Sequence, residues 1–248
     1  MKTALVTNAL DFVGPPAVQA LLEDGYKVLA HDPAFTSASA RDAFESSHEG
    51  ASALDVEEPE GIIAAARSHG GRIDVLVSND CYPAIHTPVE EASIDDLGAT
   101  LDRLVIWPFR LLKAAIPMLK EQRSGNVVMV TSCRTELPMP GGAIPDAARA
   151  AANALVQSLS LELAPYNVPV NAIAPNFLYS EAYFPKEKFI DDPAGRAFVE
   201  SVVPAGRLGD PAEIGELVSY LANMTGSFHT GTIIKFAGGW PAAPTRPE

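Results

Sequence analysis

The chain has 248 residues, 47% of them hydrophobic, and a formal net charge of −13. This length suits one α/β domain with a large core, and the acidic balance argues against nucleic acid or an anionic membrane as a partner. The two cysteines, Cys81 and Cys133, lack the spacing of a disulfide framework or a metal site. No apolar run approaches the roughly 20 residues of a membrane span. The chain begins directly with a strand, so we expect no cleaved signal and a cytoplasmic protein.

Strands and helices alternate along the chain without a break in composition, which predicts a single-domain, doubly wound parallel sheet of Rossmann-like type over residues 1–239. The predicted strands are 3–7, 28–32, 74–79, 126–132, 168–174 and 232–236. The predicted helices are 15–25, the region near 89–122, 145–166 and 211–224. Residues 176–203 have no clear hydrophobic period and predict an inserted, lid-like loop, and the proline-rich residues 240–248 predict a C-terminal arm.

The turn between the first strand and the first helix, Thr7 to Gly14, lacks the expected glycines. A glycine-rich turn here normally lets the pyrophosphate of a dinucleotide approach the backbone and sit on the helix N-terminus. Only Gly14, the glycine expected to matter for helix–strand packing, is present, and Asn8 and Phe12 occupy the other two places. We expect the Phe12 ring to fill the space of a phosphate and to leave the helix N–H groups free for a small anion. Asp32, placed where a ribose hydroxyl would be held, is then a relic or a structural acid.

Further motifs follow in order along the chain. They are the strand 74–79, Ser132 at a strand end, Asn171 to Pro175, Gly206 to Glu213, and the terminal pair Gly238-Gly239. Together with the first turn, these residues resemble the short-chain dehydrogenase/reductase superfamily over essentially the whole chain. The resemblance implies the doubly wound fold.

Within that superfamily, the pattern Thr7, Phe12, Gly14 resembles the halohydrin dehalogenases, most closely the A-type members, which use no nicotinamide. Arg149 stands where dehydrogenases carry a catalytic lysine, and Leu104 stands where they place an asparagine of the proton relay. This resemblance implies conversion of vicinal haloalcohols to epoxides and halide without a cofactor, and the reverse opening of epoxides by small anions. It also implies a homotetramer, which the alanine-rich, nearly all-apolar helix 147–163 favours.

The resemblance also implies roles for individual residues. Ser132 would bind the substrate oxygen and Arg149 would be a further catalytic residue. The halide or nucleophile would lie against Phe12 and the loop Pro175, Asn176, Phe177 and Leu178, and the substrate pocket would include Tyr82, Arg134 and Met139. No metal is implied.

Residue 145 departs from the family pattern Ser-x12-Tyr-x3-Arg, because the tyrosine position holds Pro145. A tyrosine has a pKa of about 10, and a guanidinium one helical turn away would favour its anion. Proline has no titratable group, although it suits the first position of a helix, where Asp146 beside it would complement the helix dipole. Either the chemistry is diminished, or another group such as Asp146 or Tyr82 supplies the proton transfer.

The roles of several further residues stay open. Arg134 and Glu136 form either a solvated loop or a charged pocket rim, and Cys133 is expected to point into the core. Surface or strand-end roles are the default for the histidines, which are His31, His48, His69, His86 and His229. Two rival functions remain, a non-catalytic homologue that binds small anions and an NAD(P)-dependent oxidoreductase.

Overall fold

The computed structural model describes residues 2–243 and is built around a seven-stranded sheet in the order β3-β2-β1-β4-β5-β6-β7. All neighbouring strands are parallel. The strands are β1 (Thr3–Val6), β2 (Lys27–His31), β3 (Ala51–Leu54), β4 (Val75–Asn79), β5 (Asn126–Val130), β6 (Val170–Pro175) and β7 (Ile233–Phe236). The predicted single-domain, doubly wound α/β fold is confirmed.

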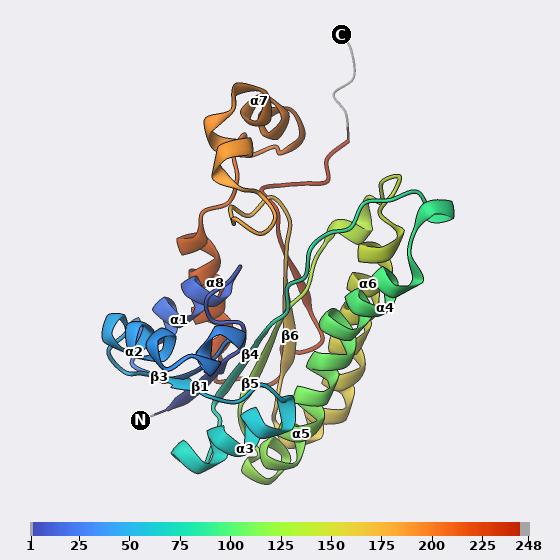
Figure 1. Cartoon of the computed structure of the whole chain (residues 1–248). Coiled ribbons are helices and arrows are strands. Elements are labelled where there is room, and N and C mark those ends of the chain that lie inside the picture. Colours follow the sequence, from blue (N-terminus) through green and yellow to red (C-terminus); the bar gives the residue numbers. More distant parts are fainter. Residues whose placement is uncertain (1, 244–248) are drawn as a thin grey trace.

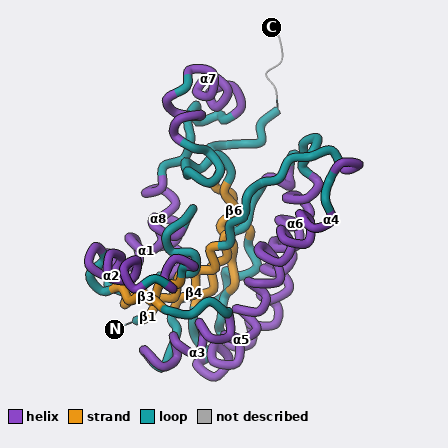
Figure 2. Tube along the Cα trace, viewed as in Figure 1, coloured by secondary structure: helices purple, strands orange, loops and turns teal. Residues whose placement is uncertain are grey.

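Helices cover both faces of this sheet (Figures 1 and 2). One side carries α1 (Gly14–Glu23), α2 (Ala38–Ser47) and α8 (Pro211–Ala222), and the other carries α3 (Pro59–Gly70), α4 (Ile94–Leu101), α5 (Trp107–Gln122) and α6 (Ala143–Leu163). Each face has its own hydrophobic cluster. Because both faces are covered, the central strands are buried throughout, which explains why their sequences are continuous apolar runs rather than alternating ones.

The predicted helix near 89–122 is largely confirmed: α4 and α5 are joined by one stretch of π-helix, Asp102–Ile106. This π-helix contains Leu104, which is buried. The elements β3, α2 and α3, by contrast, were not among the predicted ranges. β3 has the short sequence Ala-Ser-Ala-Leu at the sheet edge, where an apolar signal is weak.

Residues 176–203 are more ordered than the sequence suggested. They contain the helix α7 (Pro193–Val202) and a π-helical turn, Glu187–Asp191. The Asp192 side chain accepts a hydrogen bond from the Ala194 N–H and caps α7. A Cβ on Gly195 would come within 1.7 Å of the Lys188 carbonyl oxygen, so the π-helical turn and α7 are tightly packed. The expectation of a loop without helices is therefore wrong, although its role as a lid stays a prediction.

The beginning of the predicted C-terminal arm packs on the molecule itself. The Trp240 ring lies 5.8 Å from the Phe177 ring. The rest of the predicted arm, residues 244–248, lies outside the described residues. Among the residues described, no helix is both long enough and apolar enough to cross a bilayer.

Candidate active site

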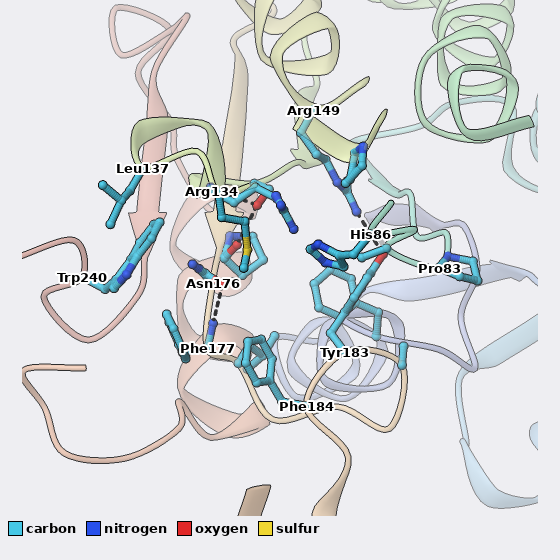
Figure 3. A pocket seen from close by; sticks show the side chains of 18 of the residues that line it. Pro83, His86, Arg134, Leu137, Arg149, Asn176, Phe177, Tyr183, Phe184 and Trp240 are labelled. Atoms are coloured by element: carbon cyan, nitrogen blue, oxygen red, sulfur yellow. Dashed lines mark hydrogen bonds between the residues drawn. The ribbon is translucent and has the colours of Figure 1, made fainter. Parts of the chain in front are cut away.

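A cavity of about 950 Å³ lies beyond the carboxyl ends of the central strands, where doubly wound sheets bind their ligands (Figure 3). Every residue that the sequence placed in the site lines this cavity. These residues are Phe12, Tyr82, Ser132, Arg134, Met139, Pro145, Arg149, Pro175, Asn176, Phe177 and Leu178. The structure thus brings together residues that come from the ends of several strands and from α6.

Arg149 is fixed at the inner wall of the cavity by groups far away in the sequence. Its Nη1 donates hydrogen bonds to the carbonyl oxygens of Asp80 (3.0 Å) and Val130 (3.4 Å). Its Nη2 donates to the Tyr183 hydroxyl (3.1 Å). The guanidinium is therefore buried but held at the ends of β4 and β5, with one edge toward the pocket.

The Tyr183 phenol is the closest partner of Arg149 in the cavity, and the sequence pattern assigned it no role. Its hydroxyl donates to the Tyr82 carbonyl oxygen (2.8 Å) and accepts from the Tyr82 N–H (3.0 Å). Burial raises the pKa of Tyr183, and the nearby Arg149 opposes that effect. The phenol is thus protonated at neutral pH and fully engaged in hydrogen bonds.

A buried carboxyl group, Asp80, lies next to Arg149. Burial raises its pKa to about 7, against the opposing effects of the Ser78 hydrogen bond and the Arg149 charge. Ser78 Oγ donates to Asp80 Oδ2 at 2.8 Å, and among the described residues Oδ1 has no partner. Sequence reasoning missed Asp80, although its position directly after the predicted strand 74–79 was an available signal.

Ser132 lies two residues after the end of β5, and its polar atoms are held by neighbouring segments. Its Oγ donates to the Pro175 carbonyl oxygen (3.2 Å) and accepts from the Arg134 N–H (3.2 Å). Its carbonyl oxygen accepts from Asn153 Nδ2 on α6 (3.0 Å). These contacts place the hydroxyl between the two loops that form the cavity wall.

Pro145 is the third residue of α6, after Gly142 as the N-cap, and not the first helical residue as the sequence suggested. At either position the missing N–H removes no helical hydrogen bond, because the first turn has no partner for it. Pro145 lines the cavity without a polar atom on its side chain. The helix is undisturbed by the proline, and the Pro145 side chain offers the cavity no group that could hold or move a proton.

The cavity rim is charged, which decides between the two roles that the sequence allowed for Arg134. Arg134 lines the cavity, and its Nε donates to Asp146 Oδ1 in an ion pair. Asp146 is therefore engaged by a cation, which argues against its service as a base. Glu136 pairs with Lys235 at 2.9 Å. Cys133 is not part of this rim; it is buried against Ala174 and Ala237, as predicted.

The first turn is filled by the Phe12 ring. This ring lines the cavity and meets the Tyr183 ring edge to face, with centroids 4.9 Å apart. Phe12 and Asn8 have φ angles of 51° and 47°, a backbone conformation that normally favours glycine. A Cβ on Gly14 would lie 2.2 Å from the Asn8 carbonyl oxygen, so Gly14 is required for packing, as predicted.

Two asparagines stabilise this turn. Asn8 Nδ2 donates to the Asn79 carbonyl oxygen (2.6 Å). Asn79 Nδ2 returns hydrogen bonds to the carbonyl oxygens of Asn8 (2.9 Å) and Asp11 (2.8 Å). The turn is therefore a closed network tied to β4.

The start of α1 offers few donors for a phosphate. The Phe12 N–H donates to the Asp11 side chain (2.7 Å) and the Gly14 N–H to the Asp11 carbonyl oxygen (2.8 Å). The next two residues, Pro15 and Pro16, have no N–H. Among the described residues, the Val13 N–H is the donor at this helix end without a partner, so the end presents fewer free N–H groups than the sequence suggested.

The side chain of the acidic residue after β2 is also engaged in hydrogen bonds. The Asp32 carboxylate accepts from the Leu10 N–H (3.0 Å) and from the Ala34 N–H (3.0 Å). Asp32 is thus a structural acid that holds the turn. Together with the Phe12 ring and the two prolines, these contacts mean that the residues at this end of the sheet do not fit a nicotinamide dinucleotide.

The loop Pro175–Leu178 faces Phe12 across the cavity and carries polar groups without partners. The Asn176 N–H donates to the Phe236 carbonyl oxygen (3.0 Å), and the Phe177 N–H donates to Asn176 Oδ1 (3.0 Å). Within residues 2–243, neither Asn176 Nδ2 nor the Leu178 N–H has a hydrogen-bond partner. The Phe177 ring packs 5.1 Å from the Phe184 ring, so these donors lie beside an aromatic wall.

His86 lines the same cavity, which the sequence did not indicate. In Figure 3 its imidazole lies between Arg134 and Tyr183 and points into the pocket. Partial desolvation and the Arg134 charge lower its pKa, and Asp146 opposes them. His86 is exposed, as expected, but its exposed imidazole lies at the cavity and not on an unrelated part of the surface. An isolated histidine in an irregular segment gave no pattern from which its place could be predicted.

Comparison with known proteins agrees with this fold. A family model described as enoyl-(acyl carrier protein) reductase matches residues 13–241. The chain is also 30% identical to the 3-oxoacyl-(acyl-carrier-protein) reductase of Vibrio cholerae, over 96% of both chains. The chain therefore belongs to the short-chain dehydrogenase/reductase superfamily.

Two solved structures are similar to this chain in sequence as well as in fold. One, titled a dehalogenation enzyme, is 36% identical with a TM-score of 0.93 and is matched over 96% of this chain and 98% of its own. The other is a halohydrin dehalogenase bound to ethyl (2S)-oxiran-2-ylacetate, 34% identical with a TM-score of 0.96 over 100% of both chains. The superfamily thus includes both reductases and dehalogenases among the relatives of this chain.

Proposed function

We propose that this protein is a cofactor-independent halohydrin dehalogenase, which converts vicinal haloalcohols to epoxides and opens epoxides with small anions such as cyanide or azide. The observation that carries the proposal is the arrangement of Phe12 opposite the loop Pro175–Leu178. The Phe12 ring lines one side of the cavity, and on the other side Asn176 and Leu178 carry N–H donors that have no partner within residues 2–243. A few N–H donors beside the aromatic rings of Phe12 and Phe177 suit a weakly hydrated anion.

In this proposal, Ser132 binds the substrate oxygen and Arg149 supplies positive charge beside it. The hydroxyl proton passes to a base, which Pro145 cannot supply, the alkoxide oxygen forms a bond to the neighbouring carbon, and the carbon–halogen bond breaks. The halide leaves with the bonding electron pair toward Asn176 and Leu178. The positive charge of Arg149 stabilises the developing alkoxide in a cavity largely shielded from water.

Two rival functions are weighed against this one. The reductase relative favours a nicotinamide enzyme, but the contacts of Asp32 and the prolines at the start of α1 argue against it. Pro145 favours a non-catalytic protein that binds small anions, because the phenol of the family pattern is absent.

A halide-release assay on a vicinal bromoalcohol tests the proposal. We expect bromide and epoxide in equal amounts with no added nicotinamide, and a large loss of rate in Ser132→Ala. The absence of halide release by the folded protein would contradict the proposal. Calorimetric titration with the four nicotinamide forms should be flat, and a micromolar Kd for any of them would favour the oxidoreductase instead.

We also propose a homotetramer in which helices of neighbouring copies pack together. The outer face of α6 exposes Ala147, Ala150 and Ala154, and Leu161 on the same helix is 79% exposed. On the neighbouring helix, Phe109 is also exposed. Exposed apolar helix faces of this kind favour association. Light scattering should give four times the chain mass of 26.2 kDa, and a monomer at micromolar concentration would contradict the proposal.

A further inference from the structure

We propose that His86 supplies the proton transfer that Pro145 cannot, with its imidazole acting as the general base toward the substrate hydroxyl held by Ser132. This inference rests on the proposed dehalogenase function. It assigns a catalytic residue in a place where the family pattern has none.

The backbone holds His86 close to the start of α6. The next residue, Thr87, donates its N–H to the Gly141 carbonyl oxygen (3.0 Å). Gly141 has a φ of 77°, and a Cβ there would come 3.3 Å from the Thr87 nitrogen, so the two segments approach closely. Because α6 begins at Ala143, this contact brings His86 beside the helical turn that contains Pro145. The imidazole therefore enters the cavity on the side where the phenol is missing (Figure 3).

The other titratable groups around the cavity are poor bases. Arginine is a cation without an acceptor, which excludes Arg134 and Arg149. Lys188 also lines the cavity, and a lysine ammonium group has no acceptor. The Tyr183 phenol has a raised pKa, and its oxygen already makes three hydrogen bonds.

The nearby carboxylates are also engaged. Asp146 pairs with Arg134, and Asp80 is buried beside Arg149 without lining the cavity. The imidazole of His86, by contrast, has no hydrogen-bond partner among the described residues and carries a lone pair. Tyr82, the other candidate from the sequence, also lines the cavity, but a phenol in its neutral form accepts a proton far less readily than a neutral imidazole does.

The electrostatic surroundings keep this imidazole neutral. Desolvation and the Arg134 guanidinium lower the pKa of His86 below 6.5, while the Asp146 carboxylate raises it. Arg149 and Lys188 add positive charge to the same cavity, and the protonated Tyr183 adds none. A general base works best when its pKa lies near the working pH and its basic form is populated.

The proton balance follows from this arrangement. The substrate O–H bond breaks and its proton moves to a ring nitrogen of His86, while the alkoxide closes the epoxide and the halide leaves. The imidazolium that results lies beside Arg134, which repels it. His86 is solvent-exposed on the cavity side, so water can take the proton and restore the neutral base. In the reverse reaction, the imidazolium returns the proton to the alkoxide formed by epoxide opening.

The test compares His86→Phe with the unchanged protein and with a double variant. General-base catalysis contributes about 10²–10⁴-fold, so we expect kcat of His86→Phe to fall at least 100-fold with little change in KM. The control is His69→Gln, which alters an exposed histidine on α3. Adding Pro145→Tyr to His86→Phe should restore activity, because it returns the phenol beside Arg149. Circular dichroism and thermal unfolding show that each variant is folded.

The pH profile provides a second measurement. In the unchanged protein, kcat should rise with pH through a pKa below 6.5 and then level off, because only neutral imidazole accepts a proton. In the rescued double variant this inflection should disappear, and a more alkaline one should replace it.

The outcomes separate the inference from the proposed function. If His86→Phe keeps its rate within twofold while halide is released, the inference is overturned and the dehalogenase function stands. If halide release requires Pro145→Tyr, the site is a dehalogenase site and the role of His86 is overturned. If neither protein releases halide, the proposed function fails, and the inference fails with it.

Discussion

Two regions of the molecule depart from the pattern of the family, and they do so in opposite ways. At the first turn, Phe12 and Asn8 take up strained backbone conformations, and the surrounding groups compensate through the Asn8–Asn79 exchange. At the start of α6, Pro145 causes no strain, and the backbone needs no compensation. The strain of the first turn is offset by packing. The loss of a phenol at residue 145 can be offset only by another group that transfers the proton.

The contrast teaches where further change is tolerated. Non-glycine residues at positive φ cost on the order of 1–3 kcal/mol each and persist only where neighbouring contacts fix them. The first turn is therefore a rigid, closed unit. The start of α6 faces an open cavity with polar groups around it, so another side chain there can take over a lost role.

The largest effect is expected from a substitution in the first turn. Gly14→Ala places a Cβ against the Asn8 carbonyl oxygen, which neither the helix nor the turn can move away from. We expect the free energy of unfolding to fall by about 3 kcal/mol or more, or the protein not to fold. Urea unfolding measures it. Gly98→Ala is the control, because a Cβ there meets nothing within 4 Å and alanine favours a helix. Equal stability of the two variants would contradict the packing role of Gly14.

The second prediction concerns the carboxyl group beside the guanidinium. Because burial raises the pKa of Asp80 to about 7, the folded protein binds a proton that the unfolded chain has lost above pH 4. Its contribution to stability therefore falls as pH rises from about 4 to 7. Asp80→Asn removes this dependence, and each pKa unit corresponds to about 1.4 kcal/mol. We expect the free energy of unfolding of Asp80→Asn, relative to the unchanged protein, to increase by about 2 kcal/mol or more between pH 4.5 and 8.

Urea unfolding at several pH values checks this second prediction. The exposed Asp42→Asn serves as the control and should show no such increase. A difference between Asp80→Asn and the unchanged protein that stays constant with pH would mean that the Asp80 carboxyl group is ionised in the fold.

The third prediction concerns the start of α6. Pro145→Tyr restores a phenol one helical turn before Arg149 without disturbing the helix. We expect halide release to rise at least tenfold, which corresponds to about 1.4 kcal/mol of barrier. Pro145→Phe provides the same ring without the hydroxyl and should give no increase. An unchanged rate in folded Pro145→Tyr would mean that another residue, such as His86, already carries the proton, or that the site has been rebuilt around a different geometry.

The smallest effect is expected where the two regions meet, at the loop Pro175–Leu178. A bromide ion should bind beside the Asn176 side chain and the Leu178 N–H, against the Phe12 ring. Anomalous diffraction from crystals soaked in bromide locates it, and solution binding should favour iodide and bromide over fluoride, which is more strongly hydrated. A pocket that stays empty at high bromide would remove the physical support for a halide site.

Much of the fold followed from local patterns in the sequence. The apolar runs of β1, β4, β5 and β6 and the periodic helices could be predicted because each depends on residues a few positions apart. The replacement of two turn glycines by Asn8 and Phe12 likewise predicted that a dinucleotide would not fit. Helix α7 was missed although Asp192 and Pro193 give a local start signal, because its aromatic residues gave no clear period.

The identity of the groups that work together in the cavity was decided only by the tertiary structure. Arg149 meets Tyr183 from 34 positions away and Asp80 from 69 positions away, and no periodicity links such residues. The pocket position of His86 depends on the contact of its loop with Gly141, and the raised pKa of Asp80 depends on burial by neighbouring elements. Sequence patterns determine what each segment becomes, because that depends on short-range backbone preferences. Proximity and desolvation arise only when distant segments pack, and these two effects determine the chemistry of the site.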